Sequence, residues 1–258
     1  MDKQDDTFAQ TIPESLVETL RTAKRVTVLT GAGISAESGL PTFRDPMKGL
    51  WAQYRPEELA SPQGFQRNPR LVWEWYAWRR EMVVQAEPNA GHRALATIEQ
   101  HIPEFTLVTQ NVDSLHQRAG SRRVIELHGN ITRTKCFEEN VQVESWTESG
   151  KEGEVPPRCP RCGGRLRPDV VWFGEQLPEQ AFQESVEAAA YADVFFSIGT
   201  SGTVEPAASL ARVAQRFGAT VVILNLDVEP LDAPPLYHIR GQAGRVLPAL
   251  VEATWPQG

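Results

Sequence analysis

The stretch VTVLTGAGISAESG, at residues 26–39, decides the fold of this chain. Its apolar beginning, residues 26–30, is typical of a buried strand, and a glycine-rich turn follows at once. Glycines in such a turn let the backbone approach a phosphate, and the helix that follows offers free N–H groups. The same glycines are equally compatible with a tight strand-to-helix turn that binds no ligand.

Outward from this stretch, apolar runs alternate with helical segments. Further strands are predicted at residues 106–109, 124–127, 170–172, 194–198 and 220–226. Helices are predicted at residues 13–23, 56–87, 91–100, 178–190, 206–217 and 246–253. This alternation predicts an α/β fold: a doubly wound, parallel, Rossmann-like sheet with a small inserted domain. Such sheets bind ligands at the carboxyl ends of their strands.

The composition fits one large domain and disfavours two kinds of partner. The chain has 258 residues, 41% of them hydrophobic, which is enough for a substantial core. Its net charge of −7 disfavours direct binding of nucleic acid. No run approaches the roughly 18 apolar residues of a membrane span, and the N-terminal MDKQDDTFAQ lacks the features of a signal peptide. We expect a cytoplasmic protein, although a processed organellar protein would look the same; a monomer is compatible with the sequence, which leaves the oligomeric state open.

Residues 135–166 differ in kind from the rest of the chain. They are rich in Glu, Gly and Pro and hold the three cysteines, Cys136, Cys159 and Cys162, the last two as C-x-x-C. A clustered, odd set of cysteines in a cytosolic protein indicates metal or redox chemistry before disulfides. With few aliphatic residues, this segment is expected to be a small insert held by a metal or by docking.

Six motifs follow the predicted strands in an order typical of one family. They read GAGISAESGLPTFRD (31–45), TQNVDSLH (109–116), ELHGN (126–130), RPDVVWFGE (167–175), GTSGTVEPA (199–207) and ILNLD (223–227). Because of these six motifs, the chain resembles the sirtuins, and the resemblance covers nearly its whole length. A hydride-transferring dehydrogenase fits poorly, because the glycines do not read G-x-G-x-x-G and no acidic residue ends a second strand about 20 residues on.

The resemblance implies an NAD-dependent protein-lysine deacylase that acts on acyl-lysine proteins. Such an enzyme releases nicotinamide and moves the acyl group to ADP-ribose, which requires reactants held in line and shielded from water. It implies that His128 and Asn111 are catalytic, His128 as the base for a ribose hydroxyl. The alternative for His128 is a core or capping histidine. His92 lacks such a context, and His116 is expected only to support its loop.

The resemblance also implies a set of NAD-binding residues. Asn111 and Asp113 belong to the nicotinamide and ribose pocket, although Asp113 is also a candidate helix N-cap. Phe43 and Arg44 belong to a flexible cofactor loop, and the adenosine end falls to residues near the C-terminus. The full set is Gly31, Ala32, Gly33, Ser35, Phe43, Arg44, Trp51, Gln110, Asn111, Asp113, Gly199, Thr200, Ser201, Asn225, Asp227 and Ala243.

Three further residues predict which acyl group is removed. Tyr76 and Arg79 form Y-x-x-R, and residues i and i+3 share one helix face. The pair resembles the desuccinylase and demalonylase branch of sirtuins, in which both groups bind the acyl carboxylate, and Ala60 matches a small residue that opens the pocket. Arginine suits bidentate carboxylate binding. The alternatives are a surface ion pair at Arg79 and an enzyme that is mainly a deacetylase.

The cysteines lie where sirtuins carry a structural zinc ribbon of four cysteines, but the pattern departs from the family. Glu139 stands where the second cysteine is expected, and no histidine lies between His128 and His238. Three interpretations stay open: zinc bound by Cys136, Cys159, Cys162 and a carboxylate such as Glu139, zinc with a water as fourth ligand, and a metal-free ribbon.

These observations predict a division of the chain into domains. Residues 1–45, 91–134 and 167–258 would form the NAD-binding domain, residues 46–90 the helical part of the small domain with the acyl pocket, and residues 135–166 the zinc-ribbon-like insert. Two functions from other classes remain as alternatives: an ADP-ribosyltransferase or NAD hydrolase that uses the same pocket, and a non-catalytic NAD sensor.

Overall fold

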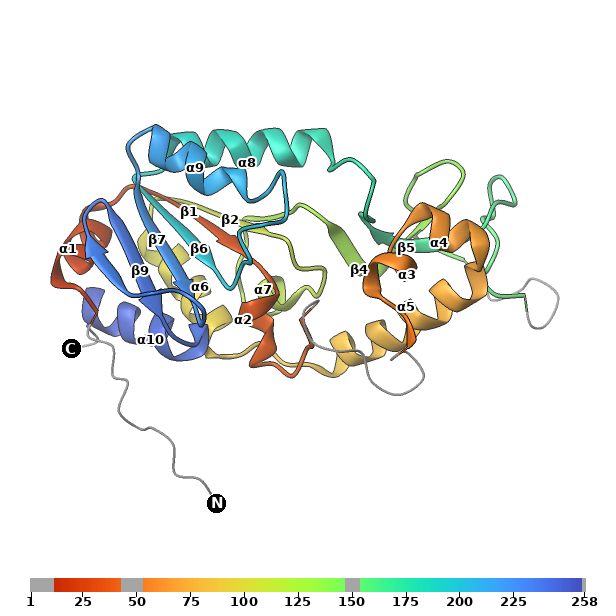
Figure 1. Ribbon diagram of the computed structural model, residues 1–258, viewed down its shortest axis with the longest axis horizontal. Coiled ribbons are helices and arrows are strands. Elements are labelled where there is room, and N and C mark those ends of the chain that lie inside the picture. Colours follow the sequence, from red (N-terminus) through yellow and green to blue (C-terminus); the bar gives the residue numbers. More distant parts are fainter. Residues whose placement is uncertain (1–11, 43–52, 147–153, 257–258) are drawn as a thin grey trace, which may run out of the picture.

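The computed structural model describes residues 12–42, 53–146 and 154–256. In this part of the chain, strands form one sheet in the order β3-β2-β1-β6-β7-β9-β8 (Figure 1). All neighbours are parallel except β8, which runs antiparallel to β9. The strands are β1 (Arg25–Thr30), β2 (Glu104–Thr109), β3 (Val124–Glu126), β6 (Val194–Ile198), β7 (Thr220–Asn225), β8 (Leu231–Ala233) and β9 (Leu236–Arg240). The predicted Rossmann-like fold class is confirmed.

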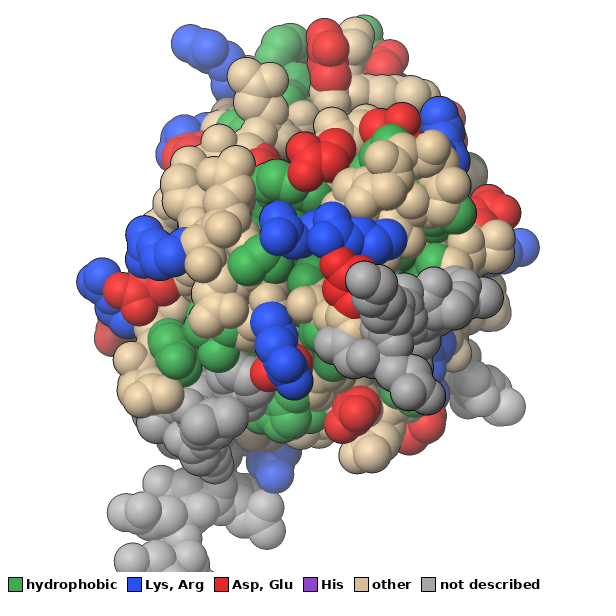
Figure 2. Space-filling view, turned by 90° about the vertical axis from the view of Figure 1, so that its right-hand side faces the viewer, with side chains coloured by type: hydrophobic (Ala, Val, Ile, Leu, Met, Phe, Trp, Pro, Cys, Tyr) green, Lys and Arg blue, Asp and Glu red, His purple; other side chains and the backbone are tan. Residues whose placement is uncertain are grey.

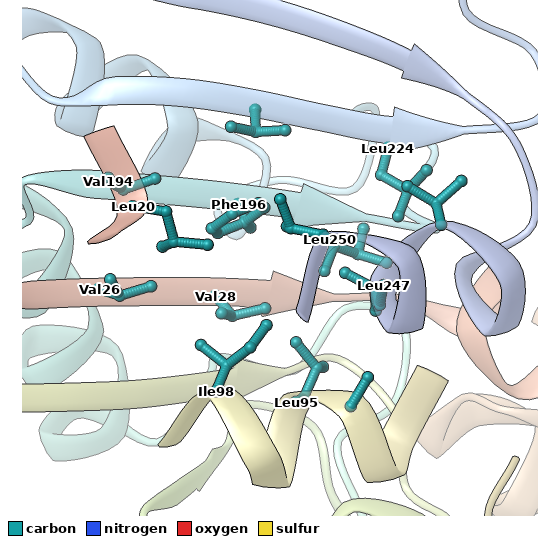
Figure 3. Packing of buried hydrophobic residues seen from close by; sticks show 14 of the residues in the cluster. Leu20, Val26, Val28, Leu95, Ile98, Val194, Phe196, Leu224, Leu247 and Leu250 are labelled. Atoms are coloured by element: carbon teal, nitrogen blue, oxygen red, sulfur yellow. The ribbon is translucent and has the colours of Figure 1, made fainter. Parts of the chain in front are cut away.

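Helices cover both faces of the sheet, and successive strand residues feed two separate cores. Val26 and Val28 of β1 point into the first core, whereas Leu29 points into the second, as the two-residue period of a strand requires. Figure 3 shows the first core between the sheet and its helices. Its helices are α1 (Glu14–Thr22), α6 (Ala90–His101) and α10 (Ala243–Thr254); the opposite face carries α8 (Glu179–Tyr191) and α9 (Ser209–Arg216).

A second, smaller unit packs beside the sheet (Figure 1). It combines a separate antiparallel pair of strands with three helices and has its own aromatic core around Phe65, Trp75, Tyr76 and Trp172. Its elements are α3 (Pro56–Leu59), α4 (Pro62–Arg67), α5 (Pro69–Gln85), β4 (Gly129–Cys136) and β5 (Leu166–Val170). Figure 2 shows acidic and basic side chains mixed on the face of the molecule at this end.

Two predicted elements are corrected here. The helical stretch predicted at residues 56–87 is three helices, because Ser61 and Asn68 each cap a new helix that begins with proline. The strand predicted at residues 170–172 is instead β5, which pairs with β4 outside the main sheet. β9 was missed because its sequence, LYHIR, holds polar residues and forms no apolar run.

Two short helices, α2 (Ala32–Ala36) and α7 (Leu115–Arg118), follow β1 and the loop after β2. Across the described ranges, no helix combines the length and apolar character that a membrane crossing requires.

Candidate active site

The predicted site residues meet at one edge of the sheet. Because β1, β2, β3, β6 and β7 are parallel, their carboxyl ends lie together. Gly31, Gln110 and Gly199 each follow a strand directly, His128 follows β3 by two residues, and Asn225 ends β7. In Figure 1 the arrowheads of β1 and β6 lie on the side of the sheet that faces β4 and α5. Residues far apart in sequence are thereby brought to one edge of the sheet.

The glycines of the first turn lie against the loop after β6. The amide of Gly33 donates to the carbonyl oxygen of Gly199 over 2.9 Å. A Cβ at Gly31 would lie 2.7 Å from that oxygen, and one at Gly33 would lie 2.7 Å from the Gly199 Cα. Gly199 has a φ of +60°, a conformation that favours glycine. These three glycines therefore let the loop after β1 contact the loop after β6, and Ala32, between Gly31 and Gly33 in sequence, is half-buried.

A buried hydrogen-bond network fixes Asn111 and Asp113. The side-chain Nδ2 of Asn111 donates to the Gly31 carbonyl oxygen over 3.0 Å and to Ser35 Oγ over 3.1 Å. Ser35 Oγ in turn donates to Asp113 Oδ2 over 2.7 Å. Asp113 Oδ1 accepts from the backbone N–H of Leu115, the first residue of α7, over 2.9 Å. The N-cap position of α7 is Ser114, which corrects the predicted N-cap at Asp113. Burial raises the pKa of Asp113, against these hydrogen bonds.

Two histidines for which the sequence predicted no catalytic role, His92 and His116, belong to this network. Asn89 N–H donates to His92 Nδ1, so the other ring nitrogen, Nε2, carries the hydrogen and faces Ser35 Oγ at 3.5 Å. His116 Nε2 lies 2.9 Å from Thr30 Oγ1, and the two imidazole rings are 4.8 Å apart. Burial lowers the pKa of His92 to about 4 and holds that of His116 well below 6.5. The capping pattern Asn89-x-x-His92 was the available signal for His92.

His128 has the geometry of a neutral base. Its Nδ1 lies 2.9 Å from the Gln110 carbonyl oxygen. A carbonyl can only accept, so Nδ1 carries the hydrogen and Nε2 keeps its lone pair. Burial lowers the pKa of His128, and the bond to Gln110 only partly opposes this. The imidazole is therefore uncharged at neutral pH, with Nε2 ready to accept a proton.

The remaining predicted NAD residues lie in the loops after β6 and β7 and at the start of α10. Asn225 Nδ2 donates to the Thr200 carbonyl oxygen over 2.6 Å, which ties the loop after β6 to the end of β7. Ser201 is exposed, as is Asp227, and Ala243 is buried at the start of α10. Three predicted residues lie outside the described part of the chain: Phe43, Arg44 and Trp51.

The predicted acyl-pocket residues lie in the small unit. Ala60 and Tyr76 are both buried in its aromatic core. The guanidinium of Arg79 lies over the ring of Trp75, 5.0 Å from its centroid, and the side chain is half-buried. Burial raises the pKa of Tyr76 to about 12, although the nearby Arg79 charge opposes the shift. A protonated phenol and a guanidinium thus stand one helical turn apart.

The three cysteines and Glu139 come together as one cluster. Their candidate ligand atoms all lie within 4.8 Å of one another, and the Sγ atoms of Cys136 and Cys162 are 3.5 Å apart. Tetrahedral zinc with three thiolates and one carboxylate needs ligand separations of roughly 3.5–3.8 Å, so the donor set fits zinc after a small contraction. Glu139 Oε2 also lies 3.5 Å from Arg161 Nε, which would compete for the carboxylate.

Comparisons with known proteins agree with this geometry. Residues 31–206 match the Sir2 family. An NAD-dependent protein deacylase 2 of Pyrobaculum aerophilum is 52% identical over 241 residues, covering 92% of this chain and 94% of the relative. An NAD-dependent protein deacylase 1 of Pseudomonas aeruginosa is 47% identical over 248 residues, covering 94% and 99%. A solved Sir2 homologue in complex with NAD superposes with a TM-score of 0.83 at 44% identity, covering 94% of each chain.

The chain belongs to the Sir2 family. Within that family it is an NAD-dependent protein deacylase with NAD as co-substrate, as the six motifs predict. A structure described as Sir2-p53 peptide-NAD+, 31% identical with a TM-score of 0.77 and covering 93% of this chain and 97% of that one, adds that a related Sir2 protein binds a peptide together with NAD.

Proposed function

We propose that this deacylase removes acidic acyl groups, succinyl or malonyl, from protein lysines, and removes acetyl groups less efficiently. The observation that carries the proposal is the pairing of Tyr76 and Arg79 on one face of α5, with the small residue Ala60 in the same hydrophobic core as Tyr76. A carboxylate at the end of the acyl chain would meet a phenol O–H and a guanidinium there.

Charge and burial support this preference. Arg79 keeps its charge even though burial lowers its pKa, because guanidinium is protonated throughout the physiological range. A hydrogen bond to a charged group contributes about 1.5–3 kcal/mol, or roughly 10–150-fold in affinity. An acetyl group has no carboxylate, so it gains none of this binding free energy. The expected preference is therefore large but leaves some deacetylation.

We propose catalytic and binding roles for the residues at the carboxyl ends of the strands. NAD supplies the ribose and the nicotinamide leaving group. His128 Nε2 would take the proton of a ribose hydroxyl, since its lone pair is left over by the bond to Gln110. Asn111, held by Gly31 and Ser35, would bind the nicotinamide and ribose end with Asp113. The glycine loops and Asn225 would hold the phosphates and the adenosine.

The organisation of the small unit also enters the proposal. Zinc would be held by Cys136, Cys159, Cys162 and Glu139 and would fasten the insert at residues 135–166, with no part in the chemistry. Residues 46–90 would carry the acyl pocket, and the rest of the chain the NAD-binding domain. The protein would act in the cytoplasm, without a nucleic-acid or membrane partner.

A comparison of two peptides tests the proposal. Purified protein, NAD and peptides of one sequence, carrying either succinyl-lysine or acetyl-lysine, are compared by nicotinamide release. The expected result is a higher kcat/KM for the succinyl peptide. Equal or faster release with the acetyl peptide contradicts the acidic preference. Release without any acyl peptide would instead indicate an NAD hydrolase or ADP-ribosyltransferase, and no release at all a sensor.

A further inference from the structure

The Tyr76 hydroxyl of the Tyr76–Arg79 pair is hydrogen-bonded to a second aromatic side chain, Trp172. Trp172 Nε1–H donates to the hydroxyl oxygen of Tyr76 over 3.0 Å, across 96 residues of sequence. Trp172 is 2% exposed and Tyr76 3% exposed, so water does not compete for this bond. An indole nitrogen can only donate, which makes the phenol oxygen the acceptor. The hydroxyl hydrogen of Tyr76 therefore remains for a second partner.

Trp172 is itself held by several contacts. The guanidinium carbon of Arg167 lies 3.3 Å from the centroid of the indole ring. Arg167 is fixed by two hydrogen bonds to the Glu175 carboxylate and one to the Val170 carbonyl oxygen. Glu175 also accepts from the backbone N–H of Trp172 over 2.7 Å. The rings of Phe65 and Trp172 pack with their centroids 5.3 Å apart. Both the backbone and the ring of Trp172 are thus constrained, and so is the direction of its N–H.

We propose that Trp172 is a positioning residue for acyl specificity: it holds the phenol of Tyr76 so that the phenol hydrogen is directed at the carboxylate of an acidic acyl group. The inference rests on the proposed preference for such groups. A carboxylate takes an O–H donor in a strong, charge-assisted bond, whereas an acetyl methyl offers no acceptor. Because burial raises the pKa of Tyr76 to about 12, the phenol keeps its hydrogen at neutral pH.

A double-mutant cycle tests whether Trp172 acts through the hydroxyl of Tyr76. The variants are Trp172→Phe, Tyr76→Phe and the two combined, and the readout is the ratio of kcat/KM for the succinyl peptide to that for the acetyl peptide at saturating NAD. Tyr76→Phe should lower the ratio about 10–150-fold, the value of one charge-assisted hydrogen bond, and Trp172→Phe should lower it by part of that amount. The double variant should lower the ratio no further than Tyr76→Phe alone.

The control and the contrary outcomes are distinct. Trp146→Phe removes another indole of the small unit, one that packs on Trp73, and should leave the ratio as it is. An unchanged ratio in Trp172→Phe, or losses that multiply in the double variant, would overturn the inference alone. A wild-type ratio of one or less would overturn the preference for acidic acyl groups, and the inference with it.

A second measurement covers the case that Trp172→Phe does not fold. In ¹⁵N-labelled protein, Tyr76→Phe should move one indole N–H signal upfield, because that N–H loses its acceptor. In the wild type the same signal should respond more to the succinyl peptide than to the acetyl peptide, because bonds in a chain polarise one another. No indole signal shifted by Tyr76→Phe would overturn the inference.

Discussion

His128 Nδ1 donates its hydrogen to the carbonyl oxygen of Gln110 over 2.9 Å, and this bond joins the residue after β2 to the loop after β3. It fixes both the tautomer and the direction of the imidazole, so that the basic nitrogen is Nε2. Since Gln110 also leads directly into Asn111, the same loop orients both proposed catalytic side chains.

His128→Ala should lower kcat of deacylation by about 10²–10⁴-fold, since the proposed base is lost. His238→Ala is the matched control and should keep wild-type kcat, because His238 lies in the middle of β9 and not at the carboxyl end of a strand. In the wild type, burial lowers the pKa of His128, so the base stays neutral to lower pH and the acid limb of kcat/KM should fall below pH 6.5. An acid limb above pH 6.5 would contradict the assignment.

The buried pair His92 and His116 should make the fold acid-sensitive. Their pKa values are lowered in the folded state, so the unfolded chain binds more protons below pH 6.5 and the free energy of unfolding rises with pH. Between pH 6.5 and about 4, His92 should contribute up to about 1.4 kcal/mol per pH unit, and His116 should steepen the same dependence below pH 6.5. Urea unfolding of wild type and His116→Gln at pH 7 and pH 5 measures this, and the variant should lose less stability on acidification. The exposed His101→Gln should behave as wild type, and equal slopes in all three proteins would rule out the effect.

Arg79→Met should lower kcat/KM for the succinyl peptide about 10–150-fold, because the carboxylate loses its charged partner, and should affect the acetyl peptide far less. Steady-state kinetics with both peptides measures the difference. Arg70→Met removes an exposed arginine from the same helix and serves as the control. Parallel losses with both peptides would mean that Arg79 supports the fold of the small unit and does not read the acyl group.

Glu139→Ala should speed the release of zinc to a chelator by at least about tenfold, and Glu139→Cys should slow it, because a fourth thiolate completes the usual sulfur set. Zinc content near one per chain in the wild type is the first check. Glu138→Ala is the neighbouring control, since Glu138 is exposed and lies outside the cluster. If Glu139→Ala releases zinc at the same rate as the wild type, water is the fourth ligand. If the purified wild-type protein contains no zinc, the ribbon is metal-free.

Local pattern alone determined much of this protein. The alternation of apolar runs with helical segments predicted the parallel sheet, and the six ordered motifs predicted the family and the enzyme class. The resemblance also predicted Asn111 and His128 as catalytic residues, and that assignment stays a prediction. Such signals are carried by a few consecutive residues, so no tertiary contact is needed to read them.

Only the tertiary structure decided the partners of these residues. His92 lies 57 residues from Ser35 in sequence, and Trp172 lies 96 residues from Tyr76, yet each pair shares a polar contact. The approach of Glu139 to three cysteines, and of Gly33 to Gly199, likewise depends on loops from different elements meeting. The physical reason is that a hydrogen bond or a close backbone contact depends on distances within about 3.5 Å, which chain folding sets and sequence spacing does not.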